Sequence, residues 1–502
     1  MVDVTIAGFG PTGAAMAGLL ARRGVSVLVL EKDTDVFPLP RAAHIDHTSL
    51  RTIQELGCLD RVMGPMIRNQ GTDLVNHDHE VLLRIPAGQD SVSNLPTSVY
   101  FYQPEMDRTL RETVAAMPGV EVKLGTELLG YEADASGVRI RARGPDGSEQ
   151  IHSASWLIGC DGSWSPVREG MPNRLIDLGF EERWLVLDLR LTGSHDSLPL
   201  DRAVQVCDPE RPHLTTPIAA NRQRFEFMLL PGEDPEVMRE RPATERLLAS
   251  WLHPEAYEVE RSATYKFHGL TAEHWRRGRV MIAGDAAHMM PPFLGQGMCS
   301  GLRDAANLAW KLAGVIHGRL RENVLDTYQA ERNPHVRRII EASIGFGRLV
   351  CITDPKAAAE RDKRFLTNGQ TPEERASFAL PRFEPGPLVR PGGGMMFIQP
   401  TIDGQRLDDI VGTRFLVIAA TEKALGSTAS WWEGVGALVK TSAQLACKNI
   451  DHWLEQFNAQ VVVVRPDRYV LGTAANLDTI TAAVGELFTQ VGASRSRSAG
   501  AR

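Results

Sequence analysis

The sequence predicts an α/β fold in which a Rossmann-like domain carries an inserted mixed β-sheet domain and is followed by a C-terminal α/β domain. Residues 1–35 follow the order strand, glycine turn, helix, strand, which implies parallel strands joined by a right-handed crossover. Residues 180–270 instead alternate short apolar runs with loops rich in proline and charge. The length of 502 residues suits two to four domains of about 100–200 residues each.

Composition and charge exclude several classes of protein. Lys and Arg number 55 against 62 Asp and Glu, a net charge of −7, so no basic excess is present to bind nucleic acid. No stretch approaches about 18 uncharged apolar residues, and the chain opens directly into a predicted strand, so we expect neither a membrane span nor a secretory signal. The six scattered cysteines show no CxxC pair or zinc-ligand spacing. We therefore expect a cytoplasmic enzyme with reduced thiols and no metal site.

The first half of the chain divides into elements by its apolar periodicity. A strand over Val2–Ala7, a helix over Thr12–Arg23 and a strand over Val25–Leu30 open the chain. Residues 40–70 and Met106–Met117 are predicted to be helical. The stretches Val120–Leu129 and Val138–Ala142, with a turn at Pro145–Gly147, predict an antiparallel meander. Ser155–Gly159 has the apolar composition of a buried strand.

The second half is predicted in the same way. Strands are expected at Leu185–Leu191, Ala203–Cys207, Arg224–Leu230 and Arg279–Ala283. Long helices are expected at Met298–His317 and Leu325–Ser343. Residues 352–395 are polar and rich in proline and glycine, which favours a linker. The last part has strands at Phe415–Ala419 and Gln460–Val464 with helical stretches around them, which indicates a separate α/β domain.

The first motif that carries chemistry is the glycine turn Gly8–Gly13, GFGPTG. Gly8 permits the tight turn after the strand, Gly10 lets backbone approach a pyrophosphate, and Gly13 lets the helix pack on the sheet. The helix N-terminus then offers free N–H groups to phosphates. Glu31 ends the second strand, where an acid accepts hydrogen bonds from a ribose. An acid there repels a 2′-phosphate, so the motif predicts FAD or NAD(H).

Two further glycine motifs follow strands. The first, Leu157–Gly162 (LIGCDG), ends a strand in an Asp-Gly turn, which by itself is only a turn signal. The second, Arg279–His288 (RVMIAGDAAH), leads into Met290–Met298 (MPPFLGQGM) and a helix. Asp285 at the end of that strand can bind sugar-like hydroxyls. The helix that begins near Gly297 can face a developing negative charge.

These three motifs, in this order, resemble those of the class A flavoprotein aromatic hydroxylases, the family typified by p-hydroxybenzoate hydroxylase. The resemblance covers residues 1–350 and is specific, because three separated motifs agree in kind and order. Within that family, several stretches look like the 3-(3-hydroxyphenyl)propionate hydroxylases: Cys207–Pro212, Arg224–Met228, Pro231–Glu233 and Arg465–Tyr469. The sequence departs from the family in a shorter linker and at Leu294 and Cys299, where many relatives carry other residues.

The resemblance implies a role for each motif residue. Arg41 matches an arginine near the flavin and pyrophosphate, Gln103 matches a glutamine at the ribityl region, and Asp161 matches an acid shared by FAD and nicotinamide-cofactor binding. The ADP half of FAD would be bound by Gly8, Gly10, Pro11, Thr12, Gly13, Glu31 and Lys32. The ribityl chain and flavin ring would be bound by Gly284, Asp285, Pro292, Gly295, Gly297 and Met298. The catalytic loop would comprise Pro292, Gly295 and Gln296.

The resemblance also implies a reaction. NADH would reduce the flavin, the reduced flavin would form a C4a-hydroperoxide with O₂, and a phenol would attack that oxygen ortho to its hydroxyl. The protein then supplies positioning, exclusion of water and charge stabilisation, without a metal. The implied activity is that of a single-component FAD-dependent NAD(P)H:aromatic monooxygenase. Its implied substrate is a phenolic acid, 3-(3-hydroxyphenyl)propionate or 3-hydroxycinnamate, and its product a catechol.

We expect a residue of the inserted sheet domain to bind the carboxylate of the substrate. Arg211, His213 and Arg224 are the candidates by position, and arginine suits bidentate carboxylate binding better than histidine does. A surface arginine is the plainer interpretation of each taken alone. Two other functions stay open, a tailoring hydroxylase of a polycyclic aromatic natural product and a non-catalytic flavin-binding protein.

Other singular residues carry weaker signals. His288 suits either a proton relay or a packing role, and His77–Glu80 is more typical of a solvated loop than of a metal cluster. Trp431 and Trp432 are predicted core residues of the last domain, which resembles a thioredoxin-like fold. Cys447 is the only cysteine of that domain, so we expect a packing or dimer-interface role for the domain, with a homodimer left open.

The domain boundaries follow from these assignments. We expect an FAD-binding domain over residues 1–70, 97–178 and 272–350, with a substrate-binding sheet domain over residues 71–96 and 179–271. A linker over 351–390 leads to the thioredoxin-like domain over 391–492. Residues 493–502, rich in Ser, Arg and Gly, are expected to be a disordered tail.

Overall fold

The computed structural model describes residues 1–193, 198–369, 371 and 379–489. The chain divides into two compact units. Unit 1 holds residues 1–22, 26–306 and 333–381, and unit 2 holds residues 23–25, 307–332 and 382–502. The expected tail at 493–502 lies outside the described residues.

The first sheet of unit 1 is the predicted nucleotide-binding sheet. Its core is parallel, in the order β18 (Val280–Ile282), β11 (Glu149–Gly159), β1 (Val2–Ala7), β2 (Val27–Leu30) and β8 (Val120–Lys123). β17 (Arg276–Arg277) adds an antiparallel edge. Helix α1 (Pro11–Ala21) connects β1 to β2, and its Ala and Leu side chains are buried. This confirms the opening strand, helix and strand that the sequence predicts.

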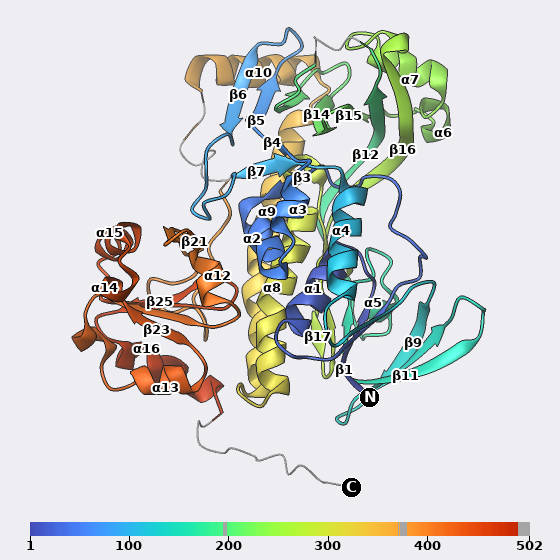
Figure 1. Cartoon of the computed structure of the whole chain (residues 1–502). Coiled ribbons are helices and arrows are strands. Elements are labelled where there is room, and N and C mark those ends of the chain that lie inside the picture. Colours follow the sequence, from blue (N-terminus) through green and yellow to red (C-terminus); the bar gives the residue numbers. More distant parts are fainter. Residues whose placement is uncertain (194–197, 370, 372–378, 490–502) are drawn as a thin grey trace. The chain divides into compact units, whose positions relative to one another are not determined.

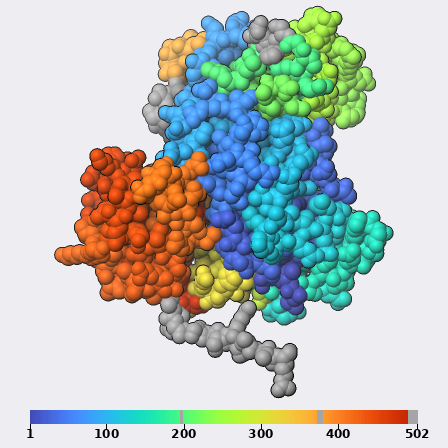
Figure 2. All heavy atoms as spheres, in the orientation of Figure 1, coloured from blue at the N-terminus to red at the C-terminus, as the bar shows by residue number. Residues whose placement is uncertain are grey.

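A meander extends from the same sheet. β9 (Glu127–Ala133), β10 (Val138–Arg143) and the first half of β11 pair antiparallel. In the space-filling view this segment forms part of the outer surface near the N-terminal strand (Figure 2). The prediction that Val120–Leu129 belongs to this meander is wrong in part, because β8 pairs parallel with β2 instead. β8 alternates apolar and charged side chains as a meander strand would, so its sequence does not mark the difference.

The second sheet of unit 1 has eight strands, mostly antiparallel, and matches the predicted inserted mixed sheet (Figure 1). Only β13 and β5 pair parallel. Its order is β19 (His288–Met289), β16 (Tyr257–Ala272), β12 (Leu175–Leu191), β15 (Arg222–Met228), β14 (His213–Ala219), β13 (Ala203–Val206), β5 (Gly71–Val75) and β6 (Val81–Pro86).

Side-chain alternation gives this second sheet two different faces. Leu185, Leu187, Phe225 and Phe227 belong to a core cluster on one face, which Leu248 of α7 (Arg241–Leu248) joins. The intervening residues, such as Val186, Arg224 and Glu226, therefore point to the opposite face. A short helix, α6 (Pro235–Met238), precedes α7.

The remaining elements of unit 1 surround these sheets. A small sheet joins β3 (His44–Asp46), β7 (Ser98–Tyr100) and β4 (Ile67–Arg68). Helices α2 (His47–Leu56) and α3 (Leu59–Met63) lie between β3 and β4 in sequence, so the prediction of helix throughout 40–70 is wrong at both ends. The other helices are α4 (Gln103–Ala115) and α5 (Pro166–Glu169). Helices α8 (Gly297–Ile316) and α9 (Asp326–Val350) contribute residues to both units.

The predicted linker contains a helix. α10 (Pro355–Asn368) is capped by the Asp354 side chain, which accepts a hydrogen bond from the Ala357 N–H. Arg361 of this helix is 5% exposed and donates to the Cys207 carbonyl oxygen at 2.6 Å. The high charge of the segment conceals its few buried residues, so a linker throughout 351–390 is wrong for these fourteen residues.

Unit 2 is a four-stranded mixed sheet with helices. The order is β23 (Leu438–Thr441), β22 (Leu416–Ala419), β24 (Val461–Val464) and β25 (Val470–Ala474), with β22 and β23 parallel and the other pairs antiparallel. This is the strand order of the thioredoxin fold and confirms that expectation. The helices are α12 (Leu407–Val411), α13 (Ala429–Gly434), α14 (Ser442–Leu445), α15 (Lys448–Gln456) and α16 (Leu477–Val484). β20 (Thr401–Ile402) and β21 (Gln405–Arg406) form a small hairpin.

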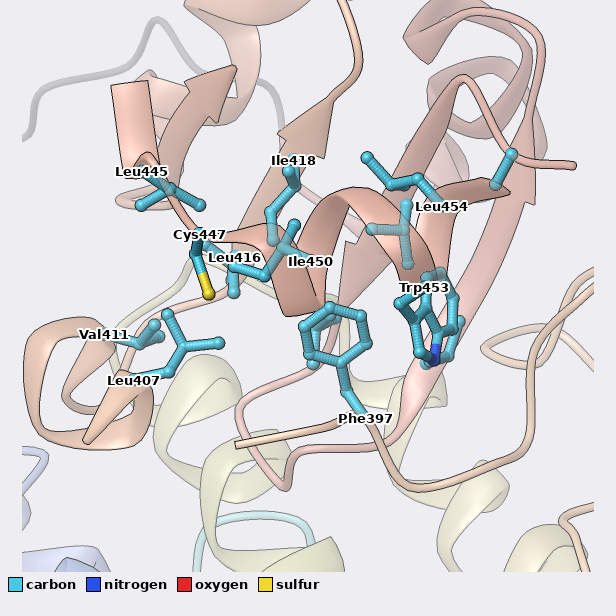
Figure 3. Close-up of a cluster of buried hydrophobic side chains, with 14 residues drawn as sticks. Phe397, Leu407, Val411, Leu416, Ile418, Leu445, Cys447, Ile450, Trp453 and Leu454 are labelled. Carbon is cyan, nitrogen blue, oxygen red and sulfur yellow. The ribbon is translucent and has the colours of Figure 1, made fainter. Parts of the chain in front are cut away.

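Unit 2 has its own core and its own buried charges. Phe397, Ile450 and Trp453 lie together in the apolar cluster of Figure 3, with Cys447 at its edge. The ring centroids of Phe397 and Trp453 are 4.8 Å apart. In the same unit the Glu331 carboxylate is fully enclosed between the Lys311 ammonium, at 2.9 Å, and the Arg465 guanidinium, at 2.8 Å.

Candidate active site

The glycine turn after β1 has the geometry that the motif requires. Gly8 has φ +94°, and a Cβ there would stand 2.4 Å from the Cys160 carbonyl oxygen. A Cβ on Gly13 would stand 2.1 Å from the Gly8 carbonyl oxygen. A Cβ on Gly10, by contrast, would meet nothing within 4 Å, because Gly10 borders the large cavity of unit 1. The turn is therefore closed on the protein side and open on the cavity side, where a phosphate can approach the start of α1.

Glu31 is tied to that turn. Its two carboxylate oxygens accept from the Phe9 N–H at 2.6 Å and the Asp33 N–H at 2.9 Å, and Arg111 lies 3.4 Å away. Each carboxylate oxygen can accept more than one hydrogen bond. Glu31 and Lys32 both line the cavity, so Glu31 can support the turn and still accept from a ribose.

The loop that carries Arg41 is fixed from two sides. The Gln103 side-chain oxygen accepts from the backbone N–H groups of Arg41 and Ala42, at 2.8 and 2.7 Å. On the other side, the Arg224 guanidinium donates to the Arg41 carbonyl oxygen at 2.7 Å and to the Pro40 carbonyl oxygen at 2.8 Å. The Arg41 guanidinium itself stands 4.5 Å over the Phe37 ring. Gln103 therefore positions this loop, in addition to lining the cavity.

Asp161 acts locally as a helix cap. Its oxygens accept from the Ser165 hydroxyl at 2.5 Å and from the Val167 N–H at 3.0 Å, at the start of α5. Burial raises the pKa of its carboxyl. Arg168 of α5 donates to the carbonyl oxygens of Ser163 and Ala286, which joins the Asp161 loop to the loop after β18. Asp161 lines the cavity at this junction.

The loop after β18 presents one carboxylate to the cavity. Gly284 has φ +63° and its neighbour Asp285 is exposed to the cavity, where no described residue forms a hydrogen bond with its carboxylate. Enclosure by the cavity walls raises the pKa of that carboxyl. His288 is turned away, because it is 1% exposed and its Nε2 lies 2.7 Å from the Asp304 carboxylate. This buried pair favours the packing role of His288 over a proton relay.

The loop from Pro292 to Met298 forms another wall of the cavity. Gly295 has φ +62°, and its carbonyl oxygen is 3.3 Å from the His44 Nδ1. The Gln296 side-chain oxygen accepts from Arg303 at 2.6 Å. Arg303 also binds the Asp46 carboxylate at 2.6 Å, and it contributes to holding the pKa of that carboxyl well below its usual range against the effect of burial. Gln296 is thus held by a buried ion pair.

One cavity of about 2280 Å³ within unit 1 brings these groups together. It exceeds the roughly 300–1,000 Å³ of an ordinary small-molecule site, so it has room for a dinucleotide and a second ligand. Its lining contains every residue to which the sequence assigned FAD, except Gly13, which packs beneath the turn, and Gly284, which lies against Thr12. Among the described residues no group of three or more His, Cys, Asp or Glu is placed to bind a metal ion.

The three candidate substrate residues are placed differently. Arg224 lines the cavity, but it forms a bidentate pair with the fully buried Asp188, at 2.7 and 3.1 Å. Arg211 and His213 are outside the cavity lining. Arg211 forms a bidentate pair with Glu233 at 2.7 and 2.6 Å, and the His213 ring stacks on Phe227. The carboxylate partners of Arg211 and Arg224 lie 22 and 36 residues away in sequence, so no local signal identifies them.

Sequence reasoning missed three polar residues of this region, Asp188, Glu226 and Arg261. Arg261 of β16 donates to both Asp188 and the Pro40 carbonyl oxygen. Glu226 faces the cavity beside Arg224. The alternation of Arg224 and Glu226 with Phe225 and Phe227 along β15 is the signal that could have found Glu226.

Comparisons with known proteins agree with this geometry. The family model of the FAD binding domain matches residues 1–343, and that of the HcaD C-terminal domain matches residues 394–490. A probable NADH-specific resorcinol 4-hydroxylase of Rhodococcus jostii is 36% identical, with 98% of this chain and 95% of the relative covered. A 3-(3-hydroxy-phenyl)propionate/3-hydroxycinnamic acid hydroxylase of Mycolicibacterium smegmatis is 34% identical, with 92% and 85% covered.

The chain belongs to the FAD-dependent aromatic hydroxylases.

Solved structures show the same fold for this hydroxylase. Aklavinone-11 hydroxylase in complex with FAD and aklavinone has a TM-score of 0.82 at 22% identity, over 97% of this chain and 99% of the other. At that identity the likeness concerns the fold alone. The hydroxylase binds FAD and is a monooxygenase, as the family resemblance of the three motifs implies. No helix among its described residues is both long and apolar enough to cross a membrane.

Proposed function

We propose that this hydroxylase converts a phenolic acid to a catechol by hydroxylation ortho to the phenol, with 3-(3-hydroxyphenyl)propionate or 3-hydroxycinnamate as its substrate. NADH is the electron donor and O₂ the co-substrate. The support is the full-length similarity to hydroxylases named for these two acids, together with a cavity that joins a dinucleotide-binding turn to the face of the second sheet. That continuous cavity is the observation that carries the proposal.

The residues of the cavity fit FAD. The open space beside Gly10 and the N-terminus of α1 suit the pyrophosphate, and Glu31 suits the adenosine ribose. The unpartnered Asp285 carboxylate suits the hydroxyls of the ribityl chain. Pro292, Gly295, Gly297 and Met298 then border the flavin ring, with Gln296 held by Arg303. When bound, FAD takes electrons from NADH and delivers one oxygen atom of O₂ to the aromatic ring.

The chain contributes enclosure and orientation to that chemistry. Phe293 of the loop packs at right angles to Phe180 and nearly so to Trp184, both with ring centroids 5.7 Å away, which closes an apolar wall next to the proposed flavin site. Exclusion of water by such a wall strengthens the polar contacts inside the cavity and protects reactive species from hydrolysis. Gln103 and Arg224 hold the Arg41 loop on the other side.

A neutral phenol of the resorcinol type is the second candidate. One observation favours it, because Arg224, the one lining residue among the three candidate carboxylate partners, is already paired with Asp188. The probable NADH-specific resorcinol 4-hydroxylase is also a relative over nearly the full length. A carboxylate in the cavity needs a cation or several N–H donors, whereas resorcinol needs only hydrogen-bond acceptors.

The deciding experiment uses the purified yellow holoprotein. NADH oxidation and O₂ uptake are measured with 3-(3-hydroxyphenyl)propionate, 3-hydroxycinnamate, resorcinol and phenol, and the products are identified by mass spectrometry and NMR. We expect stimulated oxidation and a catechol from the two acids, with NADH preferred over NADPH. Equal kcat/KM for the two nicotinamide cofactors would overturn the NADH preference. A product other than a catechol would overturn the substrate class.

Two further expectations rest on the sequence. We propose a homodimer, which light scattering of the purified protein tests directly. We also propose a cytoplasmic location for the enzyme, which fractionation of cells that express it tests.

A further inference from the structure

Glu226 lies in the centre of the sheet face that borders the cavity. It occupies β15, with Val186 of β12 directly opposite on one side and Leu214 of β14 on the other. Val186, Leu214 and Glu226 all line the cavity. Glu226 is 7% exposed, so its carboxyl group is buried between two apolar neighbours.

The Glu226 carboxylate has no hydrogen bond from any described residue. The nearest charged atom that contacts it is Nη1 of Arg224, 3.8 Å from Oε1, which is beyond hydrogen-bond range. Arg224 already binds Asp188 and the carbonyl oxygens of Pro40 and Arg41. An unsatisfied buried carboxylate is costly, and here its lone pairs face open cavity.

Glu226 also stands between the two loops proposed to hold the flavin ring. On the same face, two residues beyond Glu226 along β15, Met228 pairs with Trp184 of β12. These two residues form an apolar row across the strands, and Trp184 contacts Phe293. Two residues before Glu226 along β15, Arg224 pairs with Asp188 of β12, which in turn pairs with Arg261 of β16. These three residues form a charged row across the strands, and its arginines bind the carbonyl oxygens of Pro40 and Arg41. Same-face neighbours on a strand are about 7 Å apart, so an aromatic ring above Glu226 lies one such step from the charged row and one such step from Trp184, which packs against Phe293 of the cavity wall.

We propose that Glu226 accepts the hydrogen bond of the substrate's phenolic hydroxyl and thereby orients the ring for hydroxylation beside it. The proposal rests on the proposed function, because it takes the ligand to be a phenol. The chemistry matches, since a carboxylate between two apolar neighbours, with no hydrogen-bond donor of its own, attracts an O–H donor and repels a carboxylate. The same position suits either hydroxyl of a resorcinol, so it does not depend on which phenol is the substrate.

The same hydrogen bond prepares the ring for reaction. As the ring reacts, the phenolic O–H bond breaks and an O–H bond forms on Glu226, which leaves an electron-rich phenolate and changes no oxidation state. When the ring regains aromaticity, the hydroxylated ring carbon loses its proton to solvent, and Glu226 returns its own proton to the phenolic oxygen. Burial raises the pKa of Glu226, with Asp188 adding to the rise and Arg224 and Arg261 opposing it. A raised pKa makes the carboxylate a better match for a phenolic proton.

The test compares phenol binding with binding of its methyl ether. The oxidised holoenzyme is titrated with 3-(3-hydroxyphenyl)propionate and with 3-(3-methoxyphenyl)propionate, and binding is followed by the change in flavin absorbance. We expect the wild type to bind the phenol about tenfold to a hundredfold more tightly, the range for a hydrogen bond to a charged group. Glu226→Gln should reduce that ratio to within about threefold, since an amide is a weaker acceptor than a carboxylate.

Two further variants keep the result interpretable. Glu258→Gln alters an exposed carboxylate of β16 that pairs with Arg190 and lies outside the cavity lining, so it should retain the full ratio. Glu226→Asp keeps the charge and should retain part of the preference if Glu226→Gln fails to fold. A purely structural Glu226 would change affinity for phenol and ether alike.

The outcomes separate this inference from the proposed function. An unchanged phenol-to-ether ratio in Glu226→Gln, with the wild type still hydroxylating phenols, overturns the role of Glu226. A wild type that neither binds nor hydroxylates any phenol overturns the proposed function instead. A resorcinol titration against 3-methoxyphenol repeats the measurement for the second candidate substrate.

Discussion

Gly284 lies against Thr12 so closely that a Cβ on Gly284 would stand 2.8 Å from the Thr12 hydroxyl oxygen. The first residues of α1 and the loop that presents Asp285 therefore meet through a glycine at φ +63°. Two motifs about 270 residues apart in sequence act as one surface for the cofactor, and neither can shift without the other.

This contact makes Gly284→Ala a sharp test of the site. We expect the purified variant to contain less than about half of the FAD that the wild type contains. The left-handed conformation disfavours alanine, and the added carbon displaces Thr12. The flavin-to-protein absorbance ratio measures the loss. Gly345→Ala in α9 is the matched control, since a Cβ there meets nothing within 4 Å. Stoichiometric FAD in Gly284→Ala would mean that the two loops move independently.

Gly10→Val tests the open side of the turn. The branched side chain meets no protein atom within 4 Å of its Cβ position, so the fold should be kept while the space for the pyrophosphate is filled. We expect a colourless protein with an unchanged circular dichroism spectrum, and Gly10→Ala should retain part of the flavin. A yellow, fully loaded Gly10→Val protein would disprove the proposed phosphate position.

Asp285→Asn tests the free carboxylate. A hydrogen bond between a carboxylate and a hydroxyl is worth about 1.5–3 kcal/mol, so we expect the Kd for FAD to rise at least about tenfold. Fluorescence quenching during titration of the apoprotein gives this constant. Asp78→Asn, in an exposed loop, should leave it unchanged. Equal affinity in Asp285→Asn and the wild type would place the ribityl chain elsewhere.

The buried charges of unit 2 predict a pH-dependent stability. Burial alone would raise the pKa of Glu331, but Arg465 and Lys311 outweigh it and lower the pKa to about 2. The lowered pKa means that ionised Glu331 stabilises the folded state. This contribution to the free energy of unfolding is fully present above the ordinary pKa of 4.5 and is lost as the pH falls toward the pKa of the folded state. Glu331→Gln leaves the buried Lys311 ammonium without its carboxylate partner, while Arg465 keeps Asp467, so we expect a loss of about 3–5 kcal/mol at neutral pH.

Urea denaturation of Glu331→Gln and the wild type from pH 7 to pH 3, followed by tryptophan fluorescence, measures that loss. The difference between the two proteins should shrink below about pH 4.5. Glu433→Gln, at an exposed position of α13, should match the wild type at every pH. A constant difference across the range would show that Glu331 has the same pKa in the folded and unfolded states, which would contradict the lowered pKa.

The sequence predicts the cofactor half of this site far better than the substrate half. Gly8, Gly13 and Gly284 are recognisable because backbone geometry and close packing leave no other residue at those positions. Arg211 and Arg224 look alike in the sequence, yet Glu233 binds one and Asp188 the other. Strand register determines which side chain faces the cavity without a partner, as it does for Glu226 between Val186 and Leu214. No short sequence motif predicts that register.

The same limit explains the errors in the fold. β8 and the strands of the meander have similar patterns, and only the choice of neighbour makes β8 parallel. The helix α10 is highly charged, and its buried residues are too few to stand out against a polar segment. Local periodicity identifies strands and amphipathic helices, but it does not identify their partners.

The charged row of Asp188, Arg224 and Arg261 has a consequence for how this enzyme can change. Because both arginines also hold the Pro40–Arg41 carbonyls, a substitution in that row disturbs the loop that carries Arg41 as well as the binding surface. The apolar residues Val186 and Leu214 also line the cavity, and neither of them holds that loop. Divergence toward new aromatic substrates, in nature or by directed evolution, should therefore accumulate in the apolar positions while the charged row stays constant.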